Sequence, residues 1–582
     1  MLHQLANYAS KYKVPCLPGF RPKTAQWVIV LTGDGEFVDV IKEEKEFSLA
    51  PDLQQKELIA GGITRSHFLL DTIDVVTTYS AGKRELKKHI YFLNLLQQAT
   101  VYEKSLGKIY ALLKNDDHKQ RINEIIKTRK GRKTDTVTFR IGNIYPIELD
   151  TWHPWWQEYR NSLKGTKDIV EEAMVCLLSG KRIVPELTHL KVGGLTRVGG
   201  QSTGTVLVGF DKDSFTSYGL KQSLNAACSE EAIATYRGAL QNLIAKAPQP
   251  LAGIMFLSWF KEPIPTEDNL LDLDSLENPL AQEASARERV ERLFAAVRQG
   301  KRPDLLNNRY YILQLSATGG RIMLRDWMEG EYKTLIGNFK GWFDDLELVS
   351  PDGKGKAKDT KLIVLLSRLV GFRRGEAFSK VRERIDQELP PLMPKIWRSI
   401  IEGRTLPDTV ASKALAYIRS NLYSADEDYS TGNLDRIACA LLKAWLVRKK
   451  DREEVNKLKT ELNPRHPEPA YHLGRLMAVL AALQGSALGD VGAGVVQRYY
   501  AAASTTPSLV LGRLIQGAQH HINKLDKGLG IWYERMMEDI ITQLDAELPS
   551  TLGLEGQTLF ALGYYQQKAA MGRKTTKKEE GE

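Results

Sequence analysis

Apolar and polar positions alternate in several runs of the first half of the chain, which predicts β-strands there. The run AQWVIVLTGDGEFVDVI places two β-rich segments on either side of Asp34-Gly35, a strong hairpin signal. A second hairpin is predicted in RYYILQLSATGGRIMLRDW, with its turn at Gly319-Gly320. Single strands are predicted at TVTFRIGNIYPIEL, GTVLVGF and IMFLSWF.

Helical spacing of apolar residues predicts the remaining elements. In the first half, helices are expected over 2–13, about 83–126, 151–163 and 229–247. Ser229 is the expected N-cap of the last of these. After about Lys380 the strand signal ends, and helical patterns continue to Gln567. The predicted fold class is α+β, with an N-terminal mixed α/β region that contains hairpins and a C-terminal all-helical bundle.

The chain has 582 residues, too many for one core, so several domains are expected. EPIPTEDNLLDLDSLENPLAQE is acidic and interrupted by prolines, which indicates a linker or an exposed loop. The Pro-rich break ELNPRHPEPAYHLGRL could start a last domain. The expected segments are an α+β domain (1–261), an acidic linker or loop (262–288), an α+β middle region (289–380), a helical region (381–462) and a helical bundle (463–582).

Composition narrows the functional classes. The net charge of +10 favours a polyanionic partner. The four cysteines lie far apart in the sequence without a C-x-x-C pair, so neither a disulfide framework nor a zinc knuckle is expected. No apolar run approaches the roughly 18 residues that span a bilayer, and the N-terminus lacks the order of a secretion signal. We expect a cytoplasmic protein with no membrane partner.

A search for catalytic motifs finds one candidate, the G-x-S-x-G string Gly200–Gly204 with Ser202 as nucleophile. A nucleophile elbow needs a strand before the serine and a helix after it. Here a Gly-rich loop precedes Ser202 and a predicted strand follows, which disfavours a hydrolase. Walker, H-E-x-x-H and dinucleotide-binding motifs are absent from the sequence. The chain is therefore predicted not to be an enzyme, with no cofactor and no metal.

Glycines and positive charge meet in KVGGLTRVGGQSTG, residues 191–204, which we call the motif loop. Glycines let backbone N–H groups approach phosphates without Cβ clashes, and a glutamine can donate and accept at a base edge or wedge between base steps. An ordinary Gly-rich connector is the alternative. The candidate DNA-binding residues are Lys191, Arg197, Gly199, Gly200, Gln201, Ser202 and Gly204.

Two other basic groups are candidates for contact with a nucleic-acid backbone, with a solvated surface as the alternative for each. The first lies in KQRINEIIKTRKGRK and comprises Lys127, Arg129, Lys130, Arg132 and Lys133. The second lies in SLVLGRLIQGAQHHINKL, where a core stripe is formed by Leu511, Ile515, Ala518, Ile522 and Leu525. The opposite face, which we call the rail, carries Arg513, His520 and Lys524.

The stretch GGQSTGTVLVGFDKDSFTSYGLKQSLNAACSEEAIATYRGALQNLI resembles the signature region of the large subunit of type I-C CRISPR effector complexes (Cascade). That family shows G-x-Q-S-S-G-x-x-L-V-S-F-N, followed by S-Y-G-x-x-Q-x-x-N-A-x-x-S-E-x-A. The matching positions are Gly200, Gln201, Ser202, Gly204, Leu207, Phe210, Ser217-Tyr218-Gly219, Gln222, Asn225-Ala226 and Ser229-Glu230. The resemblance spans the chain, because four other segments are also similar to the family. They are KVPCLPGFRPKTAQWVIVLTGDGEFVDV, the mid-chain hairpin, GRLMAVLAALQGSALGDVGAGVVQRYYAAASTTP and GLEGQTLFALGYYQQKAA.

The resemblance implies a non-catalytic subunit at the 5′ end of a CRISPR RNA. Such a subunit reads the protospacer-adjacent motif in duplex DNA, helps to open the duplex, holds the displaced strand and docks a helicase-nuclease, while guide pairing reads the remaining sequence. The implied partners are CRISPR RNA, target duplex DNA with its displaced single strand, the backbone and RNA 5′-end subunits, copies of a small subunit and the helicase-nuclease. A structural scaffold that does not read DNA directly is the remaining alternative.

The resemblance also draws attention to an N-terminal loop and to the C-terminal end. GGITRSHFLLDT departs from the family's P-N-F-L-x-D-N, because Ser66-His67 stand where Pro-Asn is usual. The candidate motif-reading residues of this N-terminal loop are Thr64, Arg65, Ser66 and His67, with an ordinary polar turn as the alternative. In this subtype the small subunit is similar to the large subunit's C-terminal end and arises from an internal start, for which Met477 is an available in-frame methionine.

Overall fold

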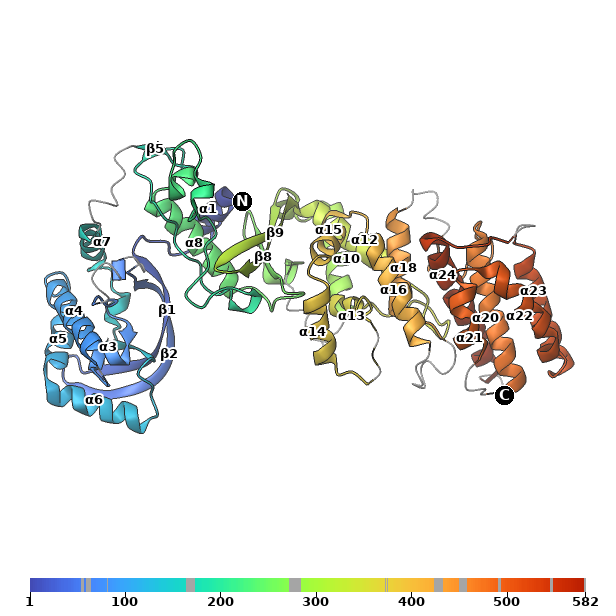
Figure 1. Cartoon of the computed structure of the whole chain (residues 1–582), viewed down its shortest axis with the longest axis horizontal. Helices are drawn as coiled ribbons and strands as arrows, with labels where there is room; N and C mark the ends of the chain where they lie inside the picture. The colour runs from blue at the N-terminus through green and yellow to red at the C-terminus, as the bar shows by residue number, and fades with distance from the viewer. Residues whose placement is uncertain are drawn as a thin grey trace. The chain divides into compact units, whose positions relative to one another are not determined.

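The computed structural model divides the chain into two compact units, and the whole chain is drawn in Figure 1. The first unit comprises residues 1–246 and 317–323, and the second comprises 247–316 and 324–582. The tip of one β-hairpin thus belongs to the first unit, although the rest of that hairpin belongs to the second. The structure describes residues 1–582 apart from 54–56, 59–63, 81, 164–172, 272–283, 372, 374, 423–432, 450–457, 490–493, 545–547 and 580–582.

A four-stranded sheet of order β2-β1-β4-β3 lies in the first unit. Its strands are β1 (Phe20–Leu31), β2 (Phe37–Pro51), β3 (Asp71–Thr72) and β4 (Thr136–Ile141). β1 runs antiparallel to β2 and parallel to β4. The hairpin predicted at Asp34-Gly35 is confirmed, and Gly35 supplies the left-handed φ of +100° that its turn requires.

Helices pack along this sheet (Figure 1). They are α3 (Ile73–Thr77), α4 (Lys83–Ala99), α5 (Leu106–Lys114) and α6 (Asp116–Thr128). The helical stretch predicted over 83–126 is confirmed, but as three helices. Asn115 separates the last two, because its side chain accepts hydrogen bonds from the N–H groups of Asp117 and His118 and so caps α6.

An aromatic cluster joins α7 (His153–Ser162) to the chain that follows the N-terminal loop. The Phe68 ring lies 5.2–5.6 Å, between centroids, from those of Trp152, Trp155 and Trp156. Trp156 also donates from its indole nitrogen to the Gly19 carbonyl at 2.8 Å. Packing on the three buried tryptophan rings therefore fixes the position of Phe68, the residue next to His67.

The helix predicted over 229–247 is α8 (Glu230–Ala245), and its N-cap is confirmed. The Ser229 hydroxyl accepts a hydrogen bond from the N–H group of Ala232 at 3.2 Å. The N-terminal helix α1 (Leu2–Lys11) packs against α8, where the Tyr8 hydroxyl donates to the Asn242 side chain at 2.7 Å. An irregular segment of the chain precedes α8 and leads directly into this helix.

That segment has little regular structure beyond the short ladder of β5 (Met174–Val175) and β6 (Arg182–Ile183). The strand predicted at GTVLVGF does not form. Thr205 makes one bridge to Val192, and Val206 makes one bridge to Arg321. Gly204 has a φ of +96°, and the partner of Val206 lies beside a hairpin turn, so no ladder continues beyond these bridges.

Two of the four cysteines meet in this region although they are far apart in the sequence. Cys176 and Cys228 are buried, and the Leu177 N–H donates to the Ala227 carbonyl at 2.8 Å beside them. Burial acts to raise the pKa of the Cys176 thiol, but hydrogen bonds led by Ser179 outweigh it and lower this pKa to about 7. Burial and contact with Cys176 raise the pKa of Cys228 to about 11.

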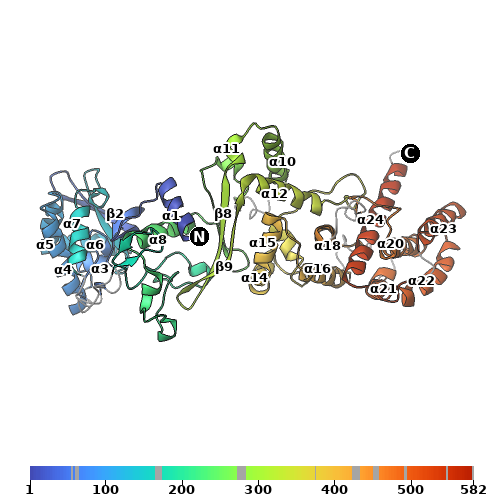
Figure 2. The same cartoon turned by 90° about the horizontal axis from the view of Figure 1, so that it is seen from above.

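The second unit begins with a three-stranded sheet of order β7-β8-β9, whose strands β8 and β9 are labelled in Figure 2. Its strands are β7 (Met255–Phe260), β8 (Arg309–Thr318) and β9 (Arg321–Glu331). The hairpin predicted at Gly319-Gly320 is confirmed, with left-handed φ angles of +56° and +83°. The predicted linker 262–288 lies partly outside the described residues, and its end forms the first turn of α10 (Ala284–Arg298).

The rest of the second unit is helical, as predicted for the C-terminal part, and no strand follows β9 in the described parts of the chain. The middle helices are α11 (Pro303–Leu306), α12 (Tyr332–Leu346), α13 (Leu362–Ser367), α14 (Phe378–Glu388), α15 (Met393–Glu402), α16 (Asp408–Asn421) and α18 (Arg436–Lys449). The last are α20 (Pro469–Leu488), α21 (Val495–Ala503), α22 (Pro507–Ile522), α23 (Lys527–Ile541) and α24 (Leu554–Glu579). None of the described helices is long and apolar enough to cross a membrane.

Candidate nucleic-acid interface

The motif loop is closed at its base by its own backbone. Val192 and Thr205 exchange two N–H to carbonyl hydrogen bonds of 2.8 Å, and both residues are fully buried. Inside the loop, the Gly200 N–H donates to the Leu195 carbonyl at 2.8 Å, and the Gly204 N–H donates to the Gln201 carbonyl at 3.0 Å. The loop therefore has a defined conformation before any ligand binds.

The glycines of the motif loop serve close packing within the chain, a role that the sequence analysis did not predict. A Cβ on Gly199 would lie 2.4 Å from the Ala317 carbonyl oxygen, and one on Gly200 would lie 2.7 Å from that of Leu195. Gly199 and Gly204 also have left-handed φ angles, of +89° and +96°. Side chains at these positions would displace the loop from its support.

That support is the tip of the β8–β9 hairpin, which belongs to the same unit. The Val206 N–H donates to the Gly320 carbonyl at 2.8 Å, and the Ile322 N–H donates to the Val206 carbonyl at 2.9 Å. The Gln201 side chain lies over the tip, because a Cβ on Gly320 would come within 3.1 Å of the Gln201 amide oxygen. The hairpin thus fixes where the glutamine amide is presented.

The outer side of the motif loop is polar and open to solvent. Its exposed side chains are those of Lys191, Thr196, Arg197, Gln201, Ser202 and Thr203. They offer cationic groups, an amide and three hydroxyls, which are the groups that contact phosphates and base edges. Ser202 lies in a turn that no helix follows, so the loop lacks the strand–turn–helix geometry of a nucleophile elbow.

The structure adds one residue to this surface that the sequence analysis missed. Arg321 follows the Gly319-Gly320 turn and forms an ion pair with Asp211, while its guanidinium lies 5.0 Å from the Phe215 ring centroid. A basic residue next to a two-glycine turn was the available sequence signal. Its place beside the motif loop depends on a tertiary contact, which a local pattern does not predict.

The N-terminal loop is tied into the fold. Arg65 donates to the Glu57 carbonyl at 2.7 Å, and Ser66 is 1% exposed. The His67 ring accepts a hydrogen bond from the Leu53 N–H at 3.3 Å. Thr64 is half-buried. The structure therefore gives Arg65, Ser66 and His67 intramolecular roles, and their predicted contact with a DNA groove stays a prediction.

Burial and neighbouring charges shift the pKa values of the ionisable groups around His67. Burial and the neighbouring Lys23 ammonium lower the pKa of His67 to about 4, so its ring is neutral at pH 7. Burial acts to raise the pKa of Asp52, but Lys23 and Arg21 outweigh it and lower this pKa to about 2. Lys23 lies 3.2 Å and Arg21 3.0 Å from the Asp52 carboxylate. Lys23 and Asp52 thus form a largely buried ion pair next to the aromatic cluster of Phe68, and the partly exposed Arg21 extends it.

In a comparison with protein families, a family model matches almost the whole chain. The family model described as CRISPR-associated protein (Cas_Csd1) matches residues 2–571. The chain belongs to this family. No curated protein matches it. The chain is thus a CRISPR-associated component of antiviral defence, and membership of the family implies that it works with other CRISPR-associated proteins and CRISPR RNA.

The basic group at the end of α6 lies on a different part of the first unit, where α6 packs on β2 and α5. Lys127, Lys130 and Lys133 are exposed. Arg129 pairs with Asp39 at 3.0 Å, and Arg132 pairs with Asp135 at 3.1 Å. All five predicted backbone contacts are therefore exposed, and the two arginines also support the local fold.

The apolar stripe and the exposed polar face predicted around α22 are both present. Leu511, Ala518 and Ile522 are buried, and Ile515 and Leu525 pack against the core, which confirms the apolar stripe. The rail side chains Arg513, His520 and Lys524 are exposed. α22 ends at Ile522, so Lys524 stands in the following turn rather than on the helix.

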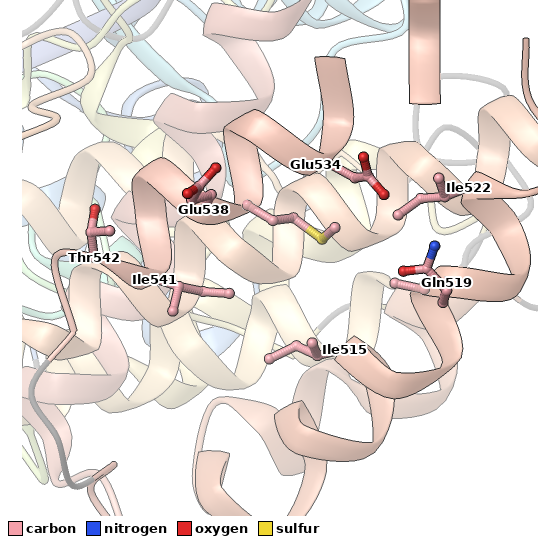
Figure 3. A pocket seen from close by; sticks show the side chains of 9 residues that line it. Ile515, Gln519, Ile522, Glu534, Glu538, Ile541 and Thr542 are labelled. Atoms are coloured by element: carbon pink, nitrogen blue, oxygen red, sulfur yellow. The ribbon is translucent and has the colours of Figure 1, made fainter. Parts of the chain in front are cut away.

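A cavity of about 290 Å³ opens between α22 and α23, and Figure 3 shows its lining. Its wall is apolar with an acidic contribution, from Ile515, Ala518, Gln519, Ile522, Glu534, Met537, Glu538, Ile541 and Thr542. Two carboxylates disfavour a phosphate backbone there. Over the described residues of the chain, no group of three or more His, Cys, Asp or Glu side chains could hold a metal ion.

Proposed function

We propose that the chain is the non-catalytic large subunit of a type I-C CRISPR RNA-guided surveillance complex in the cytoplasm. In this proposal it recognises the protospacer-adjacent motif in duplex DNA and helps to unwind the target into an R-loop. It then holds the displaced strand and recruits the helicase-nuclease. Membership of the Csd1 family and the resemblance of the signature region to type I-C large subunits support this assignment.

The observation that carries the proposal is the construction of the motif loop. Buried anchors and the hairpin tip fix the backbone, while Arg197, Gln201 and Ser202 face solvent. A polar loop held in this way loses little conformational entropy when it enters a groove, which favours recognition over mere tethering. Gln201 is the proposed base-reading or wedging residue, and Lys191 and Arg197 are proposed to contact phosphates.

The other candidate residues receive supporting roles. We assign the exposed lysines at the end of α6 to sequence-independent contact with a nucleic-acid backbone, because each neutralised phosphate adds affinity by counterion release. The rail is assigned to the displaced strand. The N-terminal loop is assigned to the groove beside the motif loop through Thr64 and Arg65, which are partly exposed. Ser66 is buried, and the His67 ring holds the loop by accepting a hydrogen bond from the Leu53 N–H.

The C-terminal helices α20 to α24 are proposed to occur also as a separate small subunit produced by an internal start. α24 contacts α20 most extensively, which supports a bundle that keeps its main interface when separated. Intact-mass analysis of the products of the untagged gene tests this. A fragment that ends at the C-terminus is expected, and its absence rules out internal initiation here. An upstream non-methionine start would keep the whole of α20, whereas Met477 lies inside α20, so a start there would remove Tyr471 and Gly474 from the interface with α24.

The test of the proposed function is the salt dependence of DNA binding by the full-length chain. A DNA-contacting subunit should bind duplex DNA with log K falling linearly against log salt, with a slope of about −0.9 for each phosphate contacted. No salt-dependent binding would favour the scaffold alternative. A fluorophosphonate probe tests the hydrolase alternative, since specific labelling of Ser202 would overturn the non-catalytic assignment.

A further inference from the structure

A tight turn projects from the irregular segment between the motif loop and α8. Ser217 and Leu220 form an antiparallel bridge, with a 2.8 Å hydrogen bond from the Leu220 N–H to the Ser217 carbonyl. Between them, Tyr218 has a φ of +50° and Gly219 a φ of +76°. Two left-handed central residues define a type I′ turn, whose first position favours Asn, Asp or Gly. A tyrosine there is under backbone strain.

The Tyr218 side chain is 99% exposed, more than any other large apolar or aromatic side chain that the structure describes. Its ring therefore gains no packing energy from its own fold. Strain without a packing gain does not stabilise the protein, and strained residues of this kind concentrate where a ligand is clamped. The ring at this turn is thus presented for a partner.

The turn is also held in place by hydrogen bonds from the residues that follow it in the sequence. The Asn225 side chain donates to the Leu220 carbonyl at 2.8 Å and to the Gln222 carbonyl at 3.0 Å. Ser223, which follows Gln222, is buried, and its N–H donates to the Leu187 carbonyl at 3.1 Å. An aromatic ring on a fixed turn can stack on a flat partner with little loss of entropy.

The chemistry around the turn favours a nucleic acid as that partner. Lys212 and Lys221 flank it and are exposed. Arg321 stacks on the half-exposed Phe215 ring and lies directly beside the motif loop through the pairing with Val206. Residues 211–219 are otherwise mostly polar or charged, unlike the apolar centre of a protein interface. Aromatic rings interspersed with cations are the usual platform for unpaired bases.

We propose that Tyr218 stacks on an unpaired DNA base at the point where the duplex next to the motif loop opens. The proposal rests on the proposed function in taking DNA as the ligand, and it assigns to this turn the step that follows motif recognition. Stacking requires no sequence preference, because every base has a π-face. Tyr218 would therefore favour the opened state of any target that the motif loop has accepted.

The test uses the full-length chain and two DNAs, a blunt duplex and a fork of the same sequence with 2-aminopurine at the first unpaired position. Tyr218→Asn removes the ring and suits the left-handed turn, and Tyr218→Trp keeps a ring. Tyr499→Ala, at an exposed tyrosine of the second unit, is the control. By the usual magnitude of base–aromatic stacking, Tyr218→Asn should lose roughly 5- to 150-fold in fork affinity.

The wild-type chain and the Tyr218→Trp and Tyr499→Ala variants should bind the fork tightly and quench the 2-aminopurine fluorescence, whereas Tyr218→Asn should do neither. All four should bind the blunt duplex equally. If the wild type binds neither DNA, the proposed function fails. If it binds both and Tyr218→Asn binds the fork as tightly as the wild type does, only the role of Tyr218 is overturned. Loss of partner subunits or of CRISPR RNA from the Tyr218→Asn complex on co-purification would also overturn it, in favour of a protein or RNA contact.

Discussion

At the scale of single residues, two buried histidines tie the stability of the first unit to pH. Burial lowers the pKa of His189 to about 4, and its ring contacts the Tyr236 hydroxyl at 2.7 Å and the Ala226 carbonyl at 3.2 Å. Burial and Lys23 lower the pKa of His67 to about 4 as well. Both rings are therefore neutral in the fold at a pH where an exposed histidine is largely protonated.

We predict an acid-sensitive window for the first unit. Because the ordinary pKa is 6.5 and the folded pKa about 4, the unfolded chain takes up protons first as the pH falls. The contribution of each histidine to stability should be constant above about pH 6.5 and fall towards pH 4, by up to about 3 kcal/mol. Asp52, with a pKa of about 2, should add a loss only below about pH 4.

Thermal unfolding of the full-length chain at a series of pH values measures this window. His189→Gln removes one of the two groups, so the variant, although less stable at pH 7, should lose less further stability between pH 6.5 and 4.5 than the wild type. An equal loss in variant and wild type would contradict the assignment of the window to His189.

At the scale of elements, α20 and α24 cross at glycines. A Cβ on Gly474 would lie 1.9 Å from the Phe560 carbonyl oxygen, and one on Gly563 would lie 2.0 Å from that of Tyr471. The buried Tyr471 hydroxyl also donates to the Gln566 side chain at 2.5 Å across the same interface. The backbones are close enough that no side chain fits at either glycine.

Gly474→Ala and Gly563→Ala should each destabilise the second unit by about 1–3 kcal/mol or more, because backbone atoms rather than flexible side chains must move. Gly485→Ala is the matched control on α20, where a Cβ meets nothing within 4 Å. The control should gain up to about 1 kcal/mol from helix propensity. Denaturant unfolding measures all three, and equal midpoints for Gly474→Ala and the control would show that the crossing is looser than described.

For the rail, on α22 and the turn that follows it, we predict a contribution to the binding of single-stranded DNA. Arg513→Glu combined with Lys524→Glu should flatten the salt dependence of single-stranded DNA binding, by about 0.7 in slope for each phosphate that the variant no longer neutralises. Lys301→Glu with Lys395→Glu is the control, since both lysines are exposed elsewhere in the second unit and the charge change is equal. Equal slopes for the two double variants would remove the rail from the proposed path of the displaced strand.

At the scale of the whole molecule, local signals predicted elements well and long-range contacts poorly. The hairpins at Asp34-Gly35 and Gly319-Gly320 and the cap at Ser229 formed where their turn and capping chemistry placed them. GTVLVGF failed as a strand because Val206 pairs with a hairpin tip more than a hundred residues away in sequence. Periodicity is local, so it gives no information on such a partner.

The same contrast between local signals and long-range contacts holds for the candidate site. The polar and cationic residues of the motif loop were identifiable from their clustering, and they are brought together on one exposed surface. The packing role of Gly199 and Gly200, the inward attachment of His67 and the position of Arg321 all depend on contacts made across the fold. The sequence alone could therefore predict which residue types form the surface, but not how it is held.

The most direct test of motif reading by the first unit compares two duplexes that differ only in the motif selected from a library by the assembled complex. The wild type and a Gln98→Ala control, at an exposed glutamine of α4, should prefer the motif-bearing duplex equally. Gln201→Ala should assemble normally and lose about 1–3 kcal/mol of affinity for the motif-bearing duplex, with little change for the other. If Gln201→Ala keeps the full wild-type preference, the motif loop does not read the motif through this residue, and the central claim is contradicted.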